Sequence, residues 1–254
     1  MISALIIAKN EESNIGPCLD SLRGFVDESL VVIDSTSTDG TERIARDRGA
    51  RVFVKEWLGY SATKSWGLEQ TSGEWILWID ADERMTPELA RAIEMELHNG
   101  LGYAAIVFPR KAFFLGRWIK HCGWYPGYVT RFFKKGKAKF DDKQVHEGLT
   151  IEGPVIKMKE PLLHYTDPDL NHYLVKFNKY TQLAAEQLYA SGRRFRISDV
   201  ILKPTAFFIK MYIIKAGFLD GWEGFMLCVL SSYYVLIKYL KLWELNLQEV
   251  KSEN

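Results

Sequence analysis

The acidic pair Asp80 and Asp82 carries the clearest chemical signal in this sequence. The two carboxylates stand one residue apart, separated by Ala81, directly after the apolar run WILWI. Carboxylate oxygens suit Mg²⁺ or Mn²⁺, and such ions often complete their shells with substrate phosphate. The same residues could instead form a cap for a helix that begins at Pro87. The spacing alone leaves a metal site and a helix cap both open.

Two further polar clusters follow apolar runs. Asp34 ends the run SLVVI, and Lys9 to Glu12 follow the run SALIIA. A short carboxylate at the end of a buried strand can accept hydrogen bonds from a nucleobase or a ribose. An ordinary turn would use the same residue, so Asp34 keeps both interpretations.

Regular elements must bring these clusters together. Strands are predicted at the apolar runs of residues 3–8, 29–34, 51–54 and 75–80. Helices are predicted between and after them, at residues 11–22, 41–49, 60–70 and from 87 onward. This alternation predicts an α/β fold with a mostly parallel sheet and helices on both faces. Ligands of such sheets bind at the carboxyl ends of the strands, where all three clusters fall.

Composition narrows the class of protein. The chain has 254 residues, 47% of them hydrophobic, and a formal charge of +1, which implies no polyanionic partner. Residues 1–109 hold 10 Lys/Arg and 18 Asp/Glu, whereas residues 110–139 hold 9 Lys/Arg and no acid. The three cysteines show neither a disulfide framework nor a zinc spacing, so we expect a reducing compartment. No signal peptide is apparent, and the longest uncharged run, residues 224–237, is short of the roughly 20 residues that span a bilayer.

Several blocks together resemble a known family. The segments ALIIAKNEE, VVIDSTSTDGT and SGEWILWIDADE occur in the order and spacing of family 2 glycosyltransferases. The segments FLGRWIKHCGWYPGYVTRFFKKG, VHEG and GFLDGWEGF are similar to a subgroup that glycosylates the inner core of bacterial lipopolysaccharide. The resemblance implies a fold of the GT-A type. The sequence lacks a Q-x-x-R-W motif, which argues against a processive synthase.

The resemblance also implies roles for individual residues. The segment from Ala8 through Asn10 to Glu11 would contact the nucleotide base, and Asp34 would bind uracil or ribose. Lys64 would lie near the base and phosphates, although Ser65 stands where the family usually has Asn. In the acidic cluster, Asp80 and Ala81 would contact ribose or diphosphate, and Asp82 would bind Mg²⁺ or Mn²⁺.

An inverting transferase also needs a carboxylate base, and the resemblance favours Glu147. Asp141 and Asp142 are the alternatives, and a solvated loop acid is the plain interpretation of Glu147. His146 could bind the metal or the diphosphate, and His164 is a similar candidate. His121 lies in the basic stretch and is expected to meet the acceptor.

The basic stretch and the last third of the chain predict the partners. Arginines interleaved with Trp and Tyr suit a phosphorylated saccharide, and no nucleic-acid-binding signature accompanies them. Lysines among aromatic residues at residues 201–242 suit an anionic membrane surface, although a packed hairpin or a dimer contact would have the same pattern. We therefore predict a nucleotide-sugar-binding part at 1–109, an acceptor-binding part of the same domain at 110–165, and a helical region at 166–254.

The leading hypothesis is an inverting, metal-dependent glycosyltransferase in the bacterial cytoplasm, peripheral on the inner face of the membrane. It would move a sugar from a nucleoside-diphosphate donor, a UDP-sugar, to a lipid-linked saccharide such as the lipopolysaccharide inner core. A nucleotidyltransferase is one alternative, but it would usually carry a Gly-rich basic loop near residue 9. A non-catalytic saccharide- or membrane-binding scaffold is the other. The sugar, the acceptor hydroxyl and the oligomeric state stay open.

Overall fold

The structure is a computed structural model that describes residues 1–100, 102–140 and 149–252. The chain divides into two compact units. Unit 1 comprises Met1–Lys111 and Gly127–His164, and unit 2 comprises Ala112–Pro126 and Tyr165–Asn254. The predicted boundary after residue 165 lies next to one of these breaks. The functional division into donor, acceptor and helical parts stays a proposal.

The sheet confirms the predicted α/β class. Its main path runs β3-β2-β1-β4-β8-β6-β12-β5, with β7 and β11 pairing with β6, and β9 and β10 form a separate pair. The first four strands of this path are parallel, whereas β8 is antiparallel to both β4 and β6. The strands are β1 (Ile2–Ala8), β2 (Glu28–Asp34), β3 (Arg51–Lys55), β4 (Trp75–Trp78), β5 (Glu83–Arg84), β6 (Ala105–Phe114), β7 (Arg117–Trp118), β8 (Gly127–Lys134), β9 (Ala138–Phe140), β10 (Leu149–Ile151), β11 (Val155–Lys157) and β12 (Leu162–Asp167).

Helices follow the strands of unit 1 and make up most of unit 2. Thr86 accepts a hydrogen bond from the Leu89 N–H at 3.2 Å, and Pro87 is the first helical residue, so the predicted start of the helix at residue 87 is confirmed. The helices are α1 (Glu12–Leu22), α2 (Thr41–Asp47), α3 (Tyr60–Gln70), α4 (Pro87–His98), α5 (Leu170–Ala190), α6 (Ile197–Ile209) and α7 (Gly221–Ser252), with a π-helix η1 (Lys210–Ile214) and a 3₁₀-helix η2 (Gly217–Asp220).

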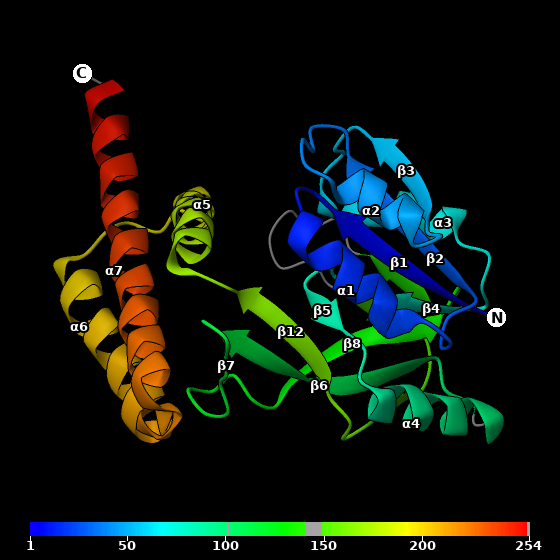
Figure 1. Ribbon diagram of the computed structural model, residues 1–254. Coiled ribbons are helices and arrows are strands. Elements are labelled where there is room, and N and C mark those ends of the chain that lie inside the picture. The colour runs from blue at the N-terminus through cyan, green and yellow to red at the C-terminus, as the bar shows by residue number, and fades with distance from the viewer. Residues whose placement is uncertain (101, 141–148, 253–254) are drawn as a thin grey trace. The chain divides into compact units, whose positions relative to one another are not determined.

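Both faces of the unit 1 sheet are covered, which explains why its strands read as continuous apolar runs. Alternate residues of β1 belong to different cores: Ala4 and Ile6 pack with residues of α1, α2 and α4, whereas Leu5 packs with β9, β10 and α3. Figure 1 shows α1 and α2 over β1 and β2. This double layer holds the carboxyl ends of β1, β2 and β4 in fixed positions.

Unit 2 has a helical core of its own. Helix α7 packs against both α5 and α6, as the long red-orange helix beside α6 in Figure 1 illustrates. Ala185, Tyr239 and Leu242 are buried between these helices. Nearer the start of α7, Cys122 and Phe114 are buried together with Leu227. The predicted helical extension is therefore confirmed as a packed arrangement of three helices.

Candidate functional site

The polar clusters of unit 1 meet at one edge of the sheet. Strand β1 lies between β2 and β4, and all three run parallel, so their carboxyl ends are neighbours. The chain leaves β1 toward β2 and β3 and then returns to the opposite side of β1 as β4. Such a reversal of strand order leaves a crevice at the strand ends, the usual ligand site of an open α/β sheet.

Asn10 joins the loops that follow β1 and β2. Its backbone adopts a left-handed conformation (φ 53°), which asparagine tolerates better than most residues. Its side-chain Oδ1 accepts hydrogen bonds from the Thr38 N–H at 2.8 Å and the Ser37 hydroxyl at 3.1 Å. Ala8 is buried at the end of β1, and the Glu11 N–H donates to the Thr41 hydroxyl at 2.8 Å. The residues predicted to contact a base thus form one fixed turn.

Asp34 is a buried carboxylate held in its charged form. It accepts hydrogen bonds from the Thr36 N–H at 2.9 Å and the Thr36 hydroxyl at 2.7 Å. These bonds and the ammonium of Lys9, 3.0 Å away, hold the pKa of Asp34 below its usual range despite its burial. The structure therefore keeps an acceptor of hydrogen bonds next to the β1 turn.

Asp80 and Glu83 share the guanidinium of Arg131. Arg131 donates to Asp80 and to Glu83, the latter at 3.0 Å, and Arg110 approaches the same Glu83 oxygen at 3.4 Å. Glu83 is fully buried; burial raises its pKa, and the charge of Arg131 opposes that shift. Arg131 is only 5% exposed; burial lowers its pKa, but the neighbouring carboxylates outweigh burial and raise it. The turn after β4 is therefore fixed by a buried ion network.

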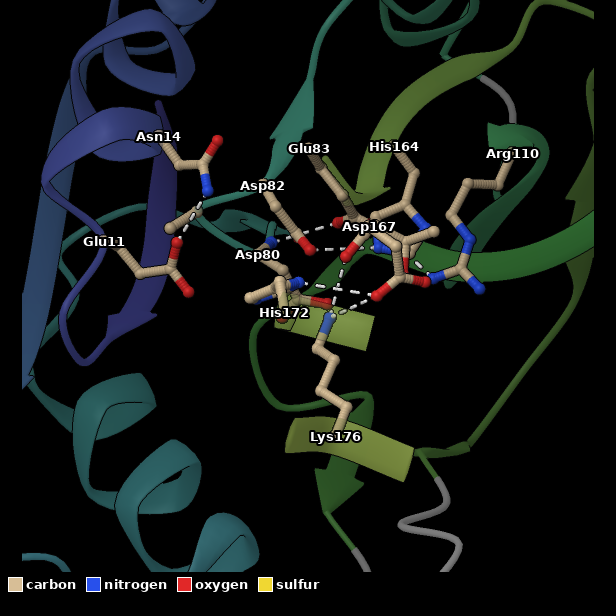
Figure 2. A network of polar contacts seen from close by, with 12 residues as sticks. Glu11, Asn14, Asp80, Asp82, Glu83, Arg110, His164, Asp167, His172 and Lys176 are labelled. Carbon is tan, nitrogen blue, oxygen red and sulfur yellow. Dashed lines mark hydrogen bonds and ion pairs between the residues drawn. The ribbon is translucent and has the colours of Figure 1, made fainter. Parts of the chain in front are cut away.

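Asp82 faces an imidazole. Its Oδ2 lies 3.3 Å from Nε2 of His164, and Figure 2 shows the two side chains directed toward one another beside Glu83. His164 reaches this position because β12 pairs with β5, with His164 opposite Glu83. Both side chains are mostly buried, so only a small part of the pair is exposed to solvent or to a ligand. A carboxylate oxygen and an imidazole nitrogen at this spacing can share one ligand.

Lys64 approaches the same region from α3. Its ammonium lies 4.3 Å from the centroid of the Trp78 ring, and the guanidinium of Arg131 lies 4.1 Å from that centroid. Lys64 is 7% exposed, so the structure places a buried cation beside the end of β4. Its position near the phosphates stays a prediction.

A chain of hydrogen bonds links the β1 and β4 clusters. Asn14 donates to Glu11 at 2.9 Å and accepts from Arg84 at 3.4 Å. Arg84 in turn donates to the Ala81 carbonyl at 2.7 Å. Figure 2 shows the bond from Asn14 to Glu11. Through Arg84, the base-side turn and the acidic turn form one connected edge.

Some predicted residues cannot be placed. Glu147, its alternatives Asp141 and Asp142, and the predicted metal ligand His146 lie outside the described residues. The other predicted residues, from Ala8 to Asp82, lie at the carboxyl ends of β1, β2 and β4, apart from Lys64 in α3. Among the described residues, no group of three or more His, Cys, Asp or Glu side chains is arranged to hold a metal ion.

The structure gives Arg131 a place that the sequence did not indicate. The basic stretch predicts phosphate-binding arginines, but Arg131 is buried and engaged by Asp80 and Glu83. Glu83 belongs to the segment SGEWILWIDADE, but the sequence analysis predicted no role for it. The contact between the two residues depends on the antiparallel pairing of β8 with β4, which apolar periodicity does not reveal.

A second polar and aromatic cluster lies within unit 2. Lys120 stacks on Trp118 at 4.7 Å, and Trp118 meets Tyr125 edge to face at 5.4 Å. Asp220 is buried and accepts hydrogen bonds from the backbone N–H of Lys120 and from His121, whose Nδ1 is 2.9 Å away. The part of the basic stretch at Lys120 and His121 is therefore held in unit 2 by a buried carboxylate.

Comparisons with known proteins show which chains this one is similar to. The family model "Glycosyl transferase family 2" matches residues 3–150. The chain is 31% identical to a lipopolysaccharide core biosynthesis glycosyltransferase of Rhizobium meliloti, with 96% of this chain and 92% of the relative covered. It is also 31% identical to an uncharacterized glycosyltransferase of Rickettsia felis, covering all of this chain and 92% of the relative. A solved glucosyl-3-phosphoglycerate synthase of Mycobacterium tuberculosis has a TM-score of 0.48 and 21% identity, covering 79% of this chain and 81% of that one.

Proposed function

The chain belongs to glycosyl transferase family 2. From this premise we propose that it moves a sugar from a UDP-sugar to a lipid-linked saccharide with inversion of configuration at the anomeric carbon. It is a glycosyltransferase with an α/β domain of the GT-A type. One observation carries the proposal: the edge formed by β1, β2 and β4 gathers Asp34, Asp80 and Asp82 with His164. Carboxylates accept hydrogen bonds from a base or a ribose, and a carboxylate and an imidazole can ligate a metal ion that in turn binds the diphosphate.

The donor would bind along the connected edge. The turn from Ala8 to Glu11 lines the base, and the ionised Asp34 accepts a hydrogen bond from the base or the ribose. Asp80 is 38% exposed through its side chain, so it can still receive a ribose or diphosphate group beside Arg131. Lys64 supplies positive charge near the phosphates.

The residues present fit a divalent cation with two protein ligands. Asp82 offers a carboxylate oxygen, the ligand type that Mg²⁺ and Mn²⁺ prefer, and His164 offers an imidazole nitrogen 3.3 Å away, which suits Mn²⁺ better than Mg²⁺. Because only two such groups converge among the described residues, the diphosphate and water would fill the other positions. When bound, Mg²⁺ or Mn²⁺ would neutralise charge that develops on the departing diphosphate.

The acceptor hydroxyl needs a base during transfer. Glu147 would take its proton while the hydroxyl oxygen forms a bond to the anomeric carbon and the bond to the UDP oxygen breaks. The electron pair of that bond leaves with UDP, and the ammonium of Lys64 near Trp78 would offset its charge. Glu147 remains a proposal from the family resemblance, with Asp141 and Asp142 as alternatives.

Unit 2 supports a saccharide acceptor at a membrane. Trp118 and Tyr125 offer ring faces for sugars, and Lys120 and Arg117 offer charge for phosphate. The relative of Rhizobium meliloti is named for lipopolysaccharide core biosynthesis, so we propose an inner-core or related lipid-linked acceptor on the cytoplasmic face of the membrane.

Attachment to that membrane is proposed to be peripheral. In the described part of the chain, Gly217–Gln248 is long and apolar enough to cross a bilayer, with a hydropathy of 1.4. However, α7 carries hydrogen bonds to its neighbours, from Ser232 to the Pro204 carbonyl at 2.7 Å and from Tyr234 to the Tyr180 carbonyl at 3.0 Å. A lone spanning helix would lose these contacts, whereas a packed surface helix keeps them.

Substitution of Asp82 tests the proposed function. We expect UDP to raise the melting temperature of the wild type only with Mn²⁺, and Asp82→Asn to lose that metal-dependent shift together with the release of UDP from a UDP-sugar. Asp47→Asn, on the exposed surface of α2, is the matched control and should behave as wild type. Near-normal turnover by Asp82→Asn would overturn the metal assignment. Release of pyrophosphate from a nucleoside triphosphate, without sugar transfer, would favour a nucleotidyltransferase.

A further inference from the structure

The turn between α6 and α7 of unit 2 has an unusual backbone. After α6 the chain forms the π-helix η1, closed by a hydrogen bond from the Lys215 N–H to the Lys210 carbonyl at 2.8 Å. Ala216 then adopts a left-handed conformation (φ 52°), and η2 leads into α7. Single π-turns are rare and are often found at functional sites. We call the segment from Ile209 to Trp222 the hairpin tip.

Buried contacts hold the hairpin tip in one shape. The Cys122 N–H donates to the Lys215 carbonyl at 3.1 Å, which anchors the tip to the 112–126 segment of the same unit. Gly217 packs so closely that a Cβ atom there would lie 2.9 Å from the Sγ atoms of Cys122 and Cys228. The surface of the tip is therefore set by tertiary packing rather than by a loose loop.

The hairpin tip exposes large apolar side chains. Six residues within fourteen positions are between 46% and 71% exposed: Ile209, Ile213, Ile214, Phe218, Leu219 and Trp222. Scattered exposed apolar residues are ordinary in soluble proteins, but a concentration of this kind marks an interaction surface.

Two lysines within the hairpin tip are left without acidic partners in the described part of the chain. Lys210 and Lys215 form no ion pair there. Lys203, earlier on α6, contrasts with them, since it binds Asp199 at 2.8 Å and the Tyr239 hydroxyl at 2.7 Å. The positive charge of the tip is therefore available to an anion from outside.

A cavity lies beside both lysines. It has a volume of about 320 Å³ and is lined by Cys122, Gly123, Trp124, Phe207, Lys210, Met211, Lys215 and Ser231. The ammonium groups of the two lysines can bind a phosphate, and Trp124, Phe207 and Met211 give the cavity an apolar wall. The lining thus combines positive charge, which suits an anionic headgroup, with apolar surface, which suits the hydrocarbon part of an amphiphile.

We propose that the hairpin tip docks on a bilayer and binds the phosphate of an anionic phospholipid between Lys210 and Lys215. The apolar side chains of the tip then lie among the acyl chains, and Trp222 lies at headgroup depth. Inorganic phosphate would leave this apolar surface in water, and protein interfaces are depleted in lysine, so a bilayer fits both features better. The inference rests on the proposed function, because it identifies the segment that brings the enzyme to its lipid-linked acceptor.

Co-sedimentation of the full-length protein tests the docking. The vesicles are phosphatidylcholine with or without phosphatidylglycerol, and no nucleotide is added. We expect binding only to vesicles that contain phosphatidylglycerol, with a loss of affinity as salt rises. Lys210→Gln/Lys215→Gln should weaken binding by about 30-fold, about fivefold for each lysine. Ile214→Ser/Phe218→Ser should also weaken it.

Matched controls keep the test decisive. Arg91→Gln/Lys159→Gln removes the same charge from exposed positions of unit 1 and should bind as wild type. Equal binding to both vesicle types, or wild-type binding by the Lys210/Lys215 variant, would overturn the proposal. The proposal would also be overturned if the protein formed a dimer and did not bind vesicles, and if Ile214→Ser/Phe218→Ser dissociated that dimer. Failure here with an intact UDP and Mn²⁺ thermal shift leaves the proposed function standing, whereas loss of that shift alone rejects the function and not the docking.

Discussion

The two units distribute charged and apolar side chains in opposite ways. At the strand edge of unit 1, charged groups are drawn inward and paired, as Glu83 with Arg131 and Asp34 with Lys9. At the hairpin tip of unit 2, isoleucine and tryptophan face outward and Lys210 and Lys215 remain without acidic partners among the described residues. The first arrangement fixes small polar groups to within hydrogen-bond distances, as a nucleotide ligand demands. The second offers a broad apolar and cationic surface, as a bilayer demands.

The largest effect is expected from the proposed base of the transfer reaction. Glu147→Gln should cut transfer by about 10² to 10⁴, the usual contribution of a positioned acid or base, while UDP still stabilises the protein. Initial rates of UDP release with saturating donor would measure this. Asp141→Asn and Asp142→Asn serve as comparisons, and if either has the larger effect, the base is that residue.

The buried ion network of unit 1 is expected to give the next largest effect. Arg131→Met leaves Glu83 buried without its main partner, and removing one partner of a buried pair costs about 3–5 kcal/mol in the free energy of unfolding. Urea denaturation measures the change. Arg91→Met, at an exposed position of α4, should stay within about 0.5 kcal/mol of wild type.

A double variant sharpens this result. If Glu83 is costly only because its charge is unpaired, Glu83→Gln should relieve part of the loss in the Arg131→Met background. We expect the two changes to couple by at least about 1 kcal/mol. Simple additivity would mean that Arg131 stabilises the fold by packing on Trp78 rather than by its charge.

Asp199 is a paired acid of unit 2 that behaves like those of unit 1. Asp199 accepts hydrogen bonds from Arg193 at 2.9 Å and 3.0 Å and from Lys203 at 2.8 Å. Burial raises the pKa of Asp199, but the bond from Lys203 and the nearby positive charges outweigh burial and leave the pKa below its ordinary value. Asp199→Asn should cost about 1–3 kcal/mol in unfolding free energy at neutral pH.

The same residue predicts a dependence on pH. A carboxyl with a lowered folded-state pKa adds stability that is present above its unfolded pKa of about 3.9 and disappears as pH falls through the folded value. The difference in unfolding free energy between wild type and Asp199→Asn should therefore shrink in acid below about pH 4. Urea denaturation at neutral and acid pH would show it, and a constant difference would contradict the assignment.

Sequence periodicity predicted the parts of unit 1 in which local and tertiary structure agree. The runs that end in Asp34 and Asp80 are apolar on both faces because both faces of the sheet are covered, and Pro87 marks the first residue of α4. The network around Asp80 was not predictable in this way. Arg131 and His164 lie 51 and 84 residues further along, and they reach the site only through the pairing of β8 with β4 and of β12 with β5.

In the helical region of residues 166–254, the sequence predicted the elements but not the contacts of individual lysines. Lysines among apolar residues predicted a helical surface, and the helices are present. The pattern did not distinguish Lys203, which binds Asp199, from Lys210 and Lys215, which lack acidic partners in the described residues. Lys203 follows Asp199 at the i,i+4 spacing of α6, whereas Lys210 and Lys215 belong to a π-turn whose hydrogen bonds have no signature in apolar spacing.

The smallest effect on stability is expected at the hairpin tip, and it is the most direct test of the contrast between the units. Ile214 is 71% exposed, so Ile214→Ala removes little buried area and should change the unfolding free energy by no more than about 0.5 kcal/mol. Ile76→Ala makes the same chemical change in a fully buried strand residue, where transfer and cavity terms together cost about 2–5 kcal/mol. Parallel urea denaturation of the two variants compares them. An Ile214→Ala variant as unstable as Ile76→Ala would mean that the tip is covered in solution, because only a covered isoleucine loses stabilisation of that size.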